Sequence, residues 1–158
     1  LEHHPRLNAS WIDNQILLNE DVNVGLAVAV EEGLLVPVVH QAARLSVTNI
    51  AERRATLVAQ AQDGSLGLDA MQGGTFTISN LGMFGITKFN AIVNPPQAAI
   101  LAVGAIEERV VAVQGDARVC PMMTLTLSCD HRVVDGARGA QFMQTLVAYL
   151  EDPLRVLE

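Results

Sequence analysis

The sequence is poor in aromatic residues although it is rich in apolar ones. Aromatic residues make up 4% of its 158 residues, while 50% are hydrophobic. This composition fits a core of Ala, Val and Leu within one chain. It fits equally an apolar surface that is buried between subunits, as in obligate oligomers. The composition alone leaves both interpretations open.

Long apolar runs, basic charge and cysteines are also scarce. The longest apolar runs, 24–30 and 98–106, have the length of strands and fall short of the ~18 residues that a membrane span needs. We identify no signal peptide, and the net charge of −7 without a basic stripe argues against a nucleic-acid partner. Cys120 and Cys129 form no disulfide pattern, which indicates a reducing compartment and small buried thiols. Lys88 is the only lysine beside nine arginines, a bias typical of a GC-rich bacterial source and hence of a cytoplasmic protein.

The pattern of apolar residues predicts many strands and two long helices without a βαβ rhythm. This favours an α+β two-layer domain, in which a mixed sheet is packed with helices. Pro37 predicts an irregularity in one strand, and the run 24–30 is expected to be buried on both faces. The expected strands are 15–18, 24–30, 34–39, 75–79, 98–106 and 122–129, with a hairpin over 110–119 that turns at 114–116.

Both helices have predictable starts. Ser46 is expected to cap a helix that ends near residues 63–64, and Asp135 one that runs from Ala137 to Glu151. The first helix is expected to bury a stripe of Val47, Ile50, Ala51, Leu57, Val58 and Ala61, with Glu52, Arg53 and Gln60 facing out. For the second helix, the expected core stripe is Ala140, Met143, Val147 and Leu150.

The stretch SCDHRVVDGARG (128–139) carries the strongest chemical signal. His131 follows an apolar strand directly, and histidine is the side chain best suited to move a proton near neutral pH. Asp135 can cap the next helix or anchor the loop through a basic partner. A histidine in a turn is more often structural, so the pattern alone does not establish catalysis. It lacks the spacing of a kinase catalytic loop or of a zinc site, and no phosphate-binding loop accompanies it.

Ser79 ends the strand 75–79 and precedes a glycine-rich segment. Such a serine can simply bond to its own backbone at a turn. Alternatively, a hydroxyl fixed at a strand end can stabilise an oxyanion. The absence of a GxSxG motif argues against a nucleophilic role. The stretch NPPQ (94–97) is interpreted from its prolines alone as a stiff extended connection.

Together these stretches resemble the dihydrolipoamide acyltransferase family, the core subunits of the 2-oxo acid dehydrogenase complexes. The resemblance covers essentially the whole chain, and SNLGMFG is more similar to the acetyl-transferring, pyruvate branch than to the succinyl branch. The stretches are RLNASW (6–11), GLLVPVV (33–39), GTFTISNLGMFGI (74–86), NPPQAAILAVGAI (94–106) and SCDHRVVDG (128–136). The motif DHRVVDG alone would also fit chloramphenicol acetyltransferase, which shares the fold.

The resemblance implies a role for each candidate residue. His131 matches the general base, Ser79 the hydroxyl that bonds the oxyanion, and Asp135 the aspartate that holds the active-site loop through an ion pair. The segment Asn80, Leu81 and Gly82 matches the lining of the pantetheine channel. Coenzyme A and lipoamide are then the substrates, and no metal is implied. The active site would lie between two subunits of a homotrimer.

The resemblance also implies a larger assembly. The trimers would build a cubic or icosahedral core that works with lipoyl domains, the decarboxylase and the dihydrolipoamide dehydrogenase, in the bacterial cytoplasm or in the mitochondrial matrix. Residues 1–158 would be the catalytic domain without its first strand and helix, and without the lipoyl and peripheral-subunit-binding domains. The arginine partner of Asp135 would then lie outside this sequence. An inactive scaffold and a small-molecule acetyltransferase of the chloramphenicol type remain alternatives.

Overall fold

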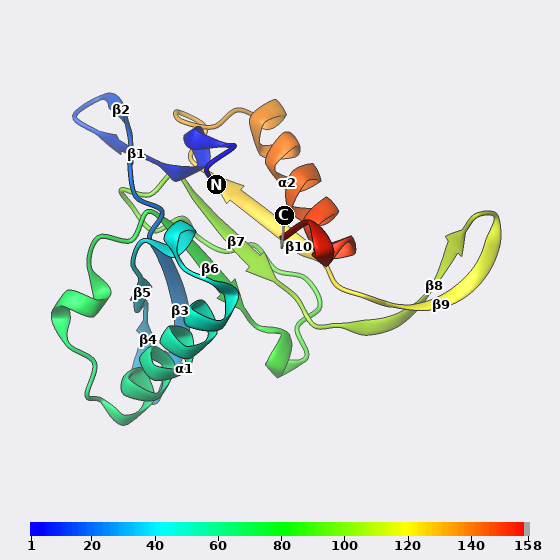
Figure 1. Ribbon diagram of the computed structural model, residues 1–158, viewed down its shortest axis with the longest axis horizontal. Coiled ribbons are helices and arrows are strands. Elements are labelled where there is room, and N and C mark those ends of the chain that lie inside the picture. The colour runs from blue at the N-terminus through cyan, green and yellow to red at the C-terminus, as the bar shows by residue number, and fades with distance from the viewer. Residues whose placement is uncertain (157–158) are drawn as a thin grey trace.

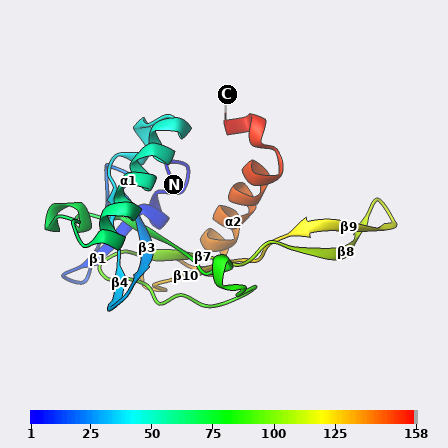
Figure 2. The same cartoon turned by 90° about the horizontal axis from the view of Figure 1, so that it is seen from below.

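The computed structural model describes residues 1–156 and shows a mixed sheet with both long helices on one of its faces (Figure 1, Figure 2). The strand order is β10–β7–β6–β3–β4, and β5 also pairs with β3. β3, β6 and β7 run parallel, and the other strands run antiparallel to their neighbours. The α+β two-layer prediction is confirmed. The strands are β3 (Val24–Val30), β4 (Gly33–Leu35), β5 (Val38–Val39), β6 (Phe76–Asn80), β7 (Ala99–Val103) and β10 (Leu125–Cys129).

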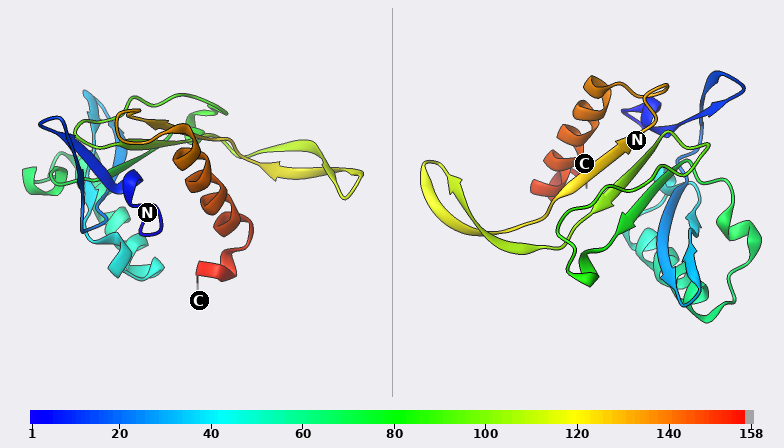
Figure 3. Two further views of the ribbon diagram at one scale, coloured as in Figure 1. Left: turned by 90° about the horizontal axis from the view of Figure 1, so that it is seen from above. Right: turned by 180° about the vertical axis from the view of Figure 1, so that it is seen from behind.

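Two hairpins lie outside this sheet. β1 (Ala9–Ile12) pairs with β2 (Gln15–Leu18), and only β2 was predicted. β8 (Glu107–Val113) and β9 (Asp116–Met122) form a long arm that projects from the body (Figure 3). Its turn lies at the predicted place, on Gln114 and Gly115. Both have positive φ angles, 55° and 92°, which suit a two-residue hairpin turn.

The two helices begin where their caps predict. α1 (Val47–Asp63) starts after Ser46, whose hydroxyl accepts a hydrogen bond from the backbone N–H of Asn49 at 3.2 Å. α2 (Gly136–Glu151) starts after Asp135, whose carboxylate accepts one from the N–H of Arg138 at 2.9 Å. These side chains satisfy N–H groups that a first helical turn leaves without partners. The predicted caps are confirmed.

The predicted buried stripe of α2 is wrong by about one position. Gly139 and Phe142 are buried, with Met143 half-buried beside them, whereas Val147 is 37% exposed and Leu150 is 48% exposed. Apolar residues occupy neighbouring stripes of this helix, so its periodicity cannot choose between them. The choice follows from Phe142, which packs against Phe76 of the sheet and against His4. The predicted core residue Ala140 is exposed.

The predicted stripe of α1 holds only in part. Val47 is 62% exposed and Ala51 is also exposed, while Ala61 is buried. Gln60, expected to face outward, is half-buried. Helix α1 contacts β3 and β5, and its residues Ile50 and Val58 face the hollow beside β3 instead of a packed core.

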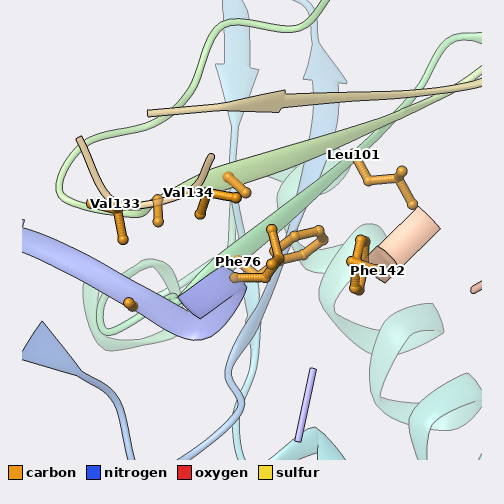
Figure 4. Packing of buried hydrophobic residues seen from close by; sticks show 9 residues of the cluster. Phe76, Leu101, Val133, Val134 and Phe142 are labelled. Carbon is orange, nitrogen blue, oxygen red and sulfur yellow. The ribbon is translucent and has the colours of Figure 1, made fainter. Parts of the chain in front are cut away.

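The core lies between α2 and the central strands (Figure 4). Phe76, Leu101 and Phe142 meet there, and Val133 and Val134 close it at the end where β10 stops. Three strand predictions need correction. The run 34–39 splits at Pro37 into β4 and β5, and β7 ends at Val103 rather than at 106. The run predicted over 122–129 is a strand only from Leu125, because Met122 belongs to the hairpin strand β9.

The strand β3 is not buried on both faces as predicted. Among its residues only Gly25 and Val28 are buried, because part of its helix-facing side borders an open hollow. The predicted burial of the cysteines is also only half right, since Cys120 and Cys129 are both half-buried free thiols. Within residues 1–156, no helix is long and apolar enough to cross a membrane.

Candidate functional site

His131 stands on a tight turn directly after β10. The N–H groups of Val133 and Val134 donate to the carbonyl of Asp130, at 2.9 and 3.0 Å, and close the turn. Both valine side chains are buried in the core, with 3% and 1% exposure. His131 is exposed and forms no hydrogen bond or ion pair with the part of the chain that the structure describes. A rigid backbone therefore presents an imidazole whose nitrogens remain available.

Asp135 is anchored from within the chain. Its carboxylate accepts the cap hydrogen bond from Arg138 and also pairs with the guanidinium of that residue. The backbone hydrogen bond from Arg138 is the largest cause that lowers the pKa of Asp135. Its partner in the structure, Arg138, lies three residues further on. Asp135 thus fixes the segment between the turn and α2.

A hollow of about 500 Å³ opens beside His131, between the edge strand β10 and the start of α2. Its lining combines strand hydroxyls, small residues of the helix and the side chain of Lys88. Cys129 also lines it, and burial raises the pKa of this thiol to about 11, which leaves it protonated near neutral pH. The hollow can accept an extended, largely apolar chain that carries a reactive group to His131.

Ser79 lies at the opposite end of the sheet, near the end of β6, and is half-buried. The segment after it is held tightly, because the N–H of Gly82 donates to the side chain of Asn80 at 2.8 Å. A Cβ on Gly82 would lie 3.0 Å from the backbone of Ala105, so this close approach favours glycine. The Ser79 hydroxyl makes no hydrogen bond to any described residue and can donate to a ligand.

A second, more apolar hollow of about 680 Å³ holds Ser79. It lies between β3, α1 and the 3-10 turn Gly82–Phe84. Asn80 and Leu81 line it, whereas Gly82 does not. The two hollows share no lining residue. The structure therefore brings Asp135 close to His131, and groups Asn80 and Leu81 with Ser79, but it does not join the two groups.

Sheet register shows how far apart these groups lie. Ser79 pairs with Ala102, and Ala102 pairs with Thr126 on the antiparallel strand β10. His131 follows Cys129, which is three residues beyond Thr126 and two strands away from β6. A rise of ~3.3 Å per residue and a strand spacing of ~4.8 Å place the backbones of Ser79 and Cys129 about 14 Å apart. His131 extends beyond that end of the sheet.

Arg132, next to His131, makes a contact with Trp11 that the sequence does not predict. The guanidinium of Arg132 pairs with Asp130 at 2.6 Å and lies 4.9 Å from the centre of the Trp11 ring. Trp11 precedes Arg132 by more than a hundred residues, and its strand was not predicted, so the sequence carried no signal of this contact. Within residues 1–156, no cluster of three or more His, Cys, Asp or Glu residues could hold a metal ion.

Comparison with known proteins gives consistent results. The family model described as 2-oxoacid dehydrogenases acyltransferase (catalytic domain) matches residues 1–158. The chain is 41% identical over 157 residues to the dihydrolipoyllysine-residue acetyltransferase component of the pyruvate dehydrogenase complex of Rickettsia felis. It is 48% identical over 156 residues to the mitochondrial component 3 of Arabidopsis thaliana. The alignments cover 99% and 97% of this chain, but the chain spans only 38% and 29% of those relatives.

Solved structures agree with the sequence comparison. The Azotobacter vinelandii dihydrolipoamide acetyltransferase superposes with a TM-score of 0.96 at 39% identity, over 100% of this chain and 66% of that one. The cubic core of a pyruvate dehydrogenase multienzyme complex gives a TM-score of 0.96 at 38% identity, with the same coverage. A chloramphenicol acetyltransferase gives a TM-score of 0.50 at 13% identity, over 89% of this chain and 67% of that one, a likeness of fold alone.

Proposed function

The chain belongs to the 2-oxoacid dehydrogenase acyltransferase family, and from this premise we propose that it transfers an acetyl group between dihydrolipoamide and coenzyme A. The observation that carries the proposal is His131, an exposed imidazole without a partner among the described residues, held on a rigid turn beside a hollow. The relatives named as acetyltransferases of the pyruvate dehydrogenase complex favour acetyl over other acyl groups.

The spacing of the candidate residues supports their roles. The Azotobacter study concerns a serine, a histidine and an asparagine in the catalytic mechanism, and in that enzyme the serine and the histidine are 52 positions apart. Ser79 and His131 are also 52 positions apart. Asp135 follows His131 by four positions, as that asparagine follows its histidine. This chain carries a carboxylate there in place of an amide.

In the proposed mechanism, a thiol must first lose its proton. A free thiol has a pKa near ~8.5 and is mostly protonated at neutral pH, so His131 accepts the proton from coenzyme A as the thiolate attacks the thioester carbonyl of acetyl-dihydrolipoamide. The hydroxyl of Ser79 donates to the oxyanion that forms. Collapse of this adduct breaks the bond to the dihydrolipoamide sulfur, and the imidazolium returns the proton to that leaving thiolate.

Because Ser79 and His131 lie at opposite ends of one sheet, we propose that each active site takes its serine from one subunit and its histidine from the next. A homotrimer fits this requirement, and the trimers would form a cubic or icosahedral core. The exposure of large apolar side chains supports the burial of surface between subunits, since Ile92 is 91% exposed and Met83 is 78% exposed. The apolar composition is then explained by subunit contacts as well as by the core.

The partners follow from the same proposal. The acetyl group would arrive on the lipoyl arm of a lipoyl domain, and the decarboxylase and dihydrolipoamide dehydrogenase subunits would load and reoxidise that arm. Asn80 and Leu81 line the Ser79 hollow and would contact the pantetheine chain of coenzyme A, while Gly82 shapes the loop. With relatives in bacteria and in mitochondria, we place the protein in the bacterial cytoplasm or in the mitochondrial matrix.

A substrate comparison tests this proposal. Initial rates of transfer to dihydrolipoamide are measured with acetyl-coenzyme A and with succinyl-coenzyme A, and chloramphenicol is offered as a competing acceptor. We expect acetyl transfer to dihydrolipoamide, a much slower succinyl reaction and no acetylation of chloramphenicol. Preferential acetylation of chloramphenicol would replace the proposal by the small-molecule alternative. No transfer from the native assembly to either acceptor would favour the inactive scaffold.

A further inference from the structure

The turn that carries His131 is held at its ends by backbone and core contacts, and in its middle by the side chain of Asp130. The hydrogen bond from Val133 to the carbonyl of Asp130 makes His131 and Arg132 its two central residues. The buried side chain of Val133 holds one end, and the backbone of Asp130 holds the other. The peptide unit between His131 and Arg132 is oriented through its N–H, which donates to the side chain of Asp130. Its orientation decides where the imidazole points.

Arg132 is held on two sides. Its Nε donates to both carboxylate oxygens of Asp130, at 3.0 and 3.2 Å, and its Nη2 donates to Oδ2 at 2.6 Å. Its backbone N–H donates to Oδ1 of the same carboxylate at 3.0 Å. An ion pair at a side chain that is 61% exposed is weak by itself. The guanidinium also lies over the Trp11 ring, at a distance where a cation and an aromatic face attract each other.

Trp11 is a fixed support because its strand is joined to the same backbone as the turn. The N–H of Trp11 donates to the carbonyl of Pro96 at 3.1 Å, and the N–H of Ala98 donates to the carbonyl of Ala9 at 3.0 Å. The N–H of Asp130 in turn donates to the carbonyl of Ala98 at 2.8 Å. Three successive hydrogen bonds thus join the indole-bearing strand to the start of the turn.

From this geometry we propose that Arg132, clamped between the Asp130 carboxylate and the Trp11 indole, is a positioning residue that orients His131 and screens it from the Asp130 charge. The proposal rests on the role of His131 as the base. Fixing Arg132 fixes the adjoining peptide unit, so the imidazole is held in its reactive direction before substrate binds. The guanidinium also offsets the negative charge of the carboxylate next to the histidine.

The electrostatic part of the proposal has a definite sign. The hydrogen bond from the Arg132 side chain is the main cause that keeps the pKa of Asp130 below its ordinary value, so this carboxylate is charged throughout the working range. Without the guanidinium, the carboxylate charge beside His131 would no longer be offset and would favour the charged imidazolium. The charged and titratable groups near His131 are Asp130, Arg132 and Asp135 on its own segment, Arg138 on α2, and Cys129 and Lys88 along the hollow.

The clamp is tested with four variants in the native assembly: Arg132→Gln, Arg132→Lys, Trp11→Leu and Trp11→Phe. The readouts are kcat and KM for coenzyme A and dihydrolipoamide, kcat/KM against pH, and Tm. Arg44→Gln is the matched control, because Arg44 is also exposed and also pairs with an aspartate, Asp21, at 3.1 Å.

We expect Arg132→Gln to lower kcat about 10- to 100-fold, because small misplacements of a reacting group have effects of this size. Both KM values should stay within about twofold, and the acidic limb of the pH profile should move to higher pH. Trp11→Leu should lower kcat with a smaller pH shift, because the charge of Arg132 remains. Arg132→Lys should restore the pH profile but not the full kcat, and Trp11→Phe should restore most of kcat.

Wild-type kcat with an unshifted pH profile in Arg132→Gln would overturn the proposal. The proposal would also be overturned if Arg44→Gln lost as much kcat as Arg132→Gln in proportion to its loss of Tm. It would equally be overturned if Trp11→Phe lost as much kcat as Trp11→Leu. Each of these outcomes removes the role of Arg132 but leaves the proposed function intact, as long as His131→Ala abolishes acetyl transfer. If His131→Ala keeps the wild-type rate, the proposed function fails and the role of Arg132 falls with it.

Discussion

The distance between Ser79 and His131 predicts that two defective variants restore activity when their chains share one assembly. The backbones of Ser79 and Cys129 lie about 14 Å apart by sheet geometry, and His131 extends further. A base and an oxyanion donor must both come within ~3 Å of one reacting thioester. One chain cannot meet this requirement, so Ser79→Ala and His131→Ala should complement each other.

The expected size of the effect follows from random mixing. If each site takes its serine from one subunit and its histidine from the next, equal amounts of the two variants leave about a quarter of the sites with both residues. The mixed assembly should therefore approach a quarter of the wild-type rate. The Ser79→Ala assembly alone should retain only about a hundredth to a thousandth of it. The contrast is at least tenfold and needs no assumption about the size of the core.

The assay uses co-expression of the two variants with different affinity tags. Two successive purifications isolate assemblies that contain both chains, and their initial rate of acetyl transfer is measured. Separately purified variant assemblies that are mixed only in the cuvette serve as the control. A mixed assembly no faster than the mean of the two variants would refute the two-subunit site, because it would mean that both residues act from one chain.

Three further outcomes follow from single contacts. Ser79→Ala should lower kcat about 100- to 1000-fold with little change in KM, since it removes one oxyanion donor. Steady-state kinetics would contradict this expectation if KM rose and kcat stayed unchanged. Phe142→Ala should cost about 3–5 kcal/mol in urea unfolding because its ring fills the core, whereas the exposed neighbour variant Gln141→Ala should cost less than about 1 kcal/mol. Asp135→Ala should lower Tm at pH 7, and Asp135→Asn, which keeps a cap acceptor, should lower it less. Because the folded-state pKa of Asp135 lies below its ordinary value of 3.8, the difference in Tm from wild type should be full above that pH. This difference in Tm should be lost as the pH falls through the folded-state pKa. A difference that persists in acid would contradict the claim that the ionised carboxylate of Asp135 stabilises the helix.

Local features of the fold were predictable because a few neighbouring residues decide them. Ser46 and Asp135 cap their helices through the N–H three residues later, and this contact depends only on local sequence. The hairpin turn at Gln114 and Gly115 is equally local. Pro37 interrupts its strand because it cannot donate a hydrogen bond to a neighbouring strand. Each prediction needed no knowledge of the rest of the chain.

Features that depend on distant partners were not predictable. Strand β1 exists because it pairs with β2 and contacts residues 96–98, and its composition alone does not indicate a strand. The buried face of α2 was misassigned because Phe76, far away in sequence, decides which apolar stripe faces the sheet. The resemblance identified Ser79 and His131, but strand order sets their separation. The local sequence does not indicate a role for Arg132, because the side chain that supports it, Trp11, comes from the other end of the chain.

The role of His131 as the base is tested by acetyl transfer from acetyl-coenzyme A to dihydrolipoamide, measured for the wild type, for His131→Ala and for His40→Ala. His40 is an exposed histidine that lines neither hollow and serves as the matched control. We expect a loss of about 100- to 10,000-fold in His131→Ala, the range of a general base, and a wild-type rate in His40→Ala. A wild-type rate in His131→Ala would contradict it.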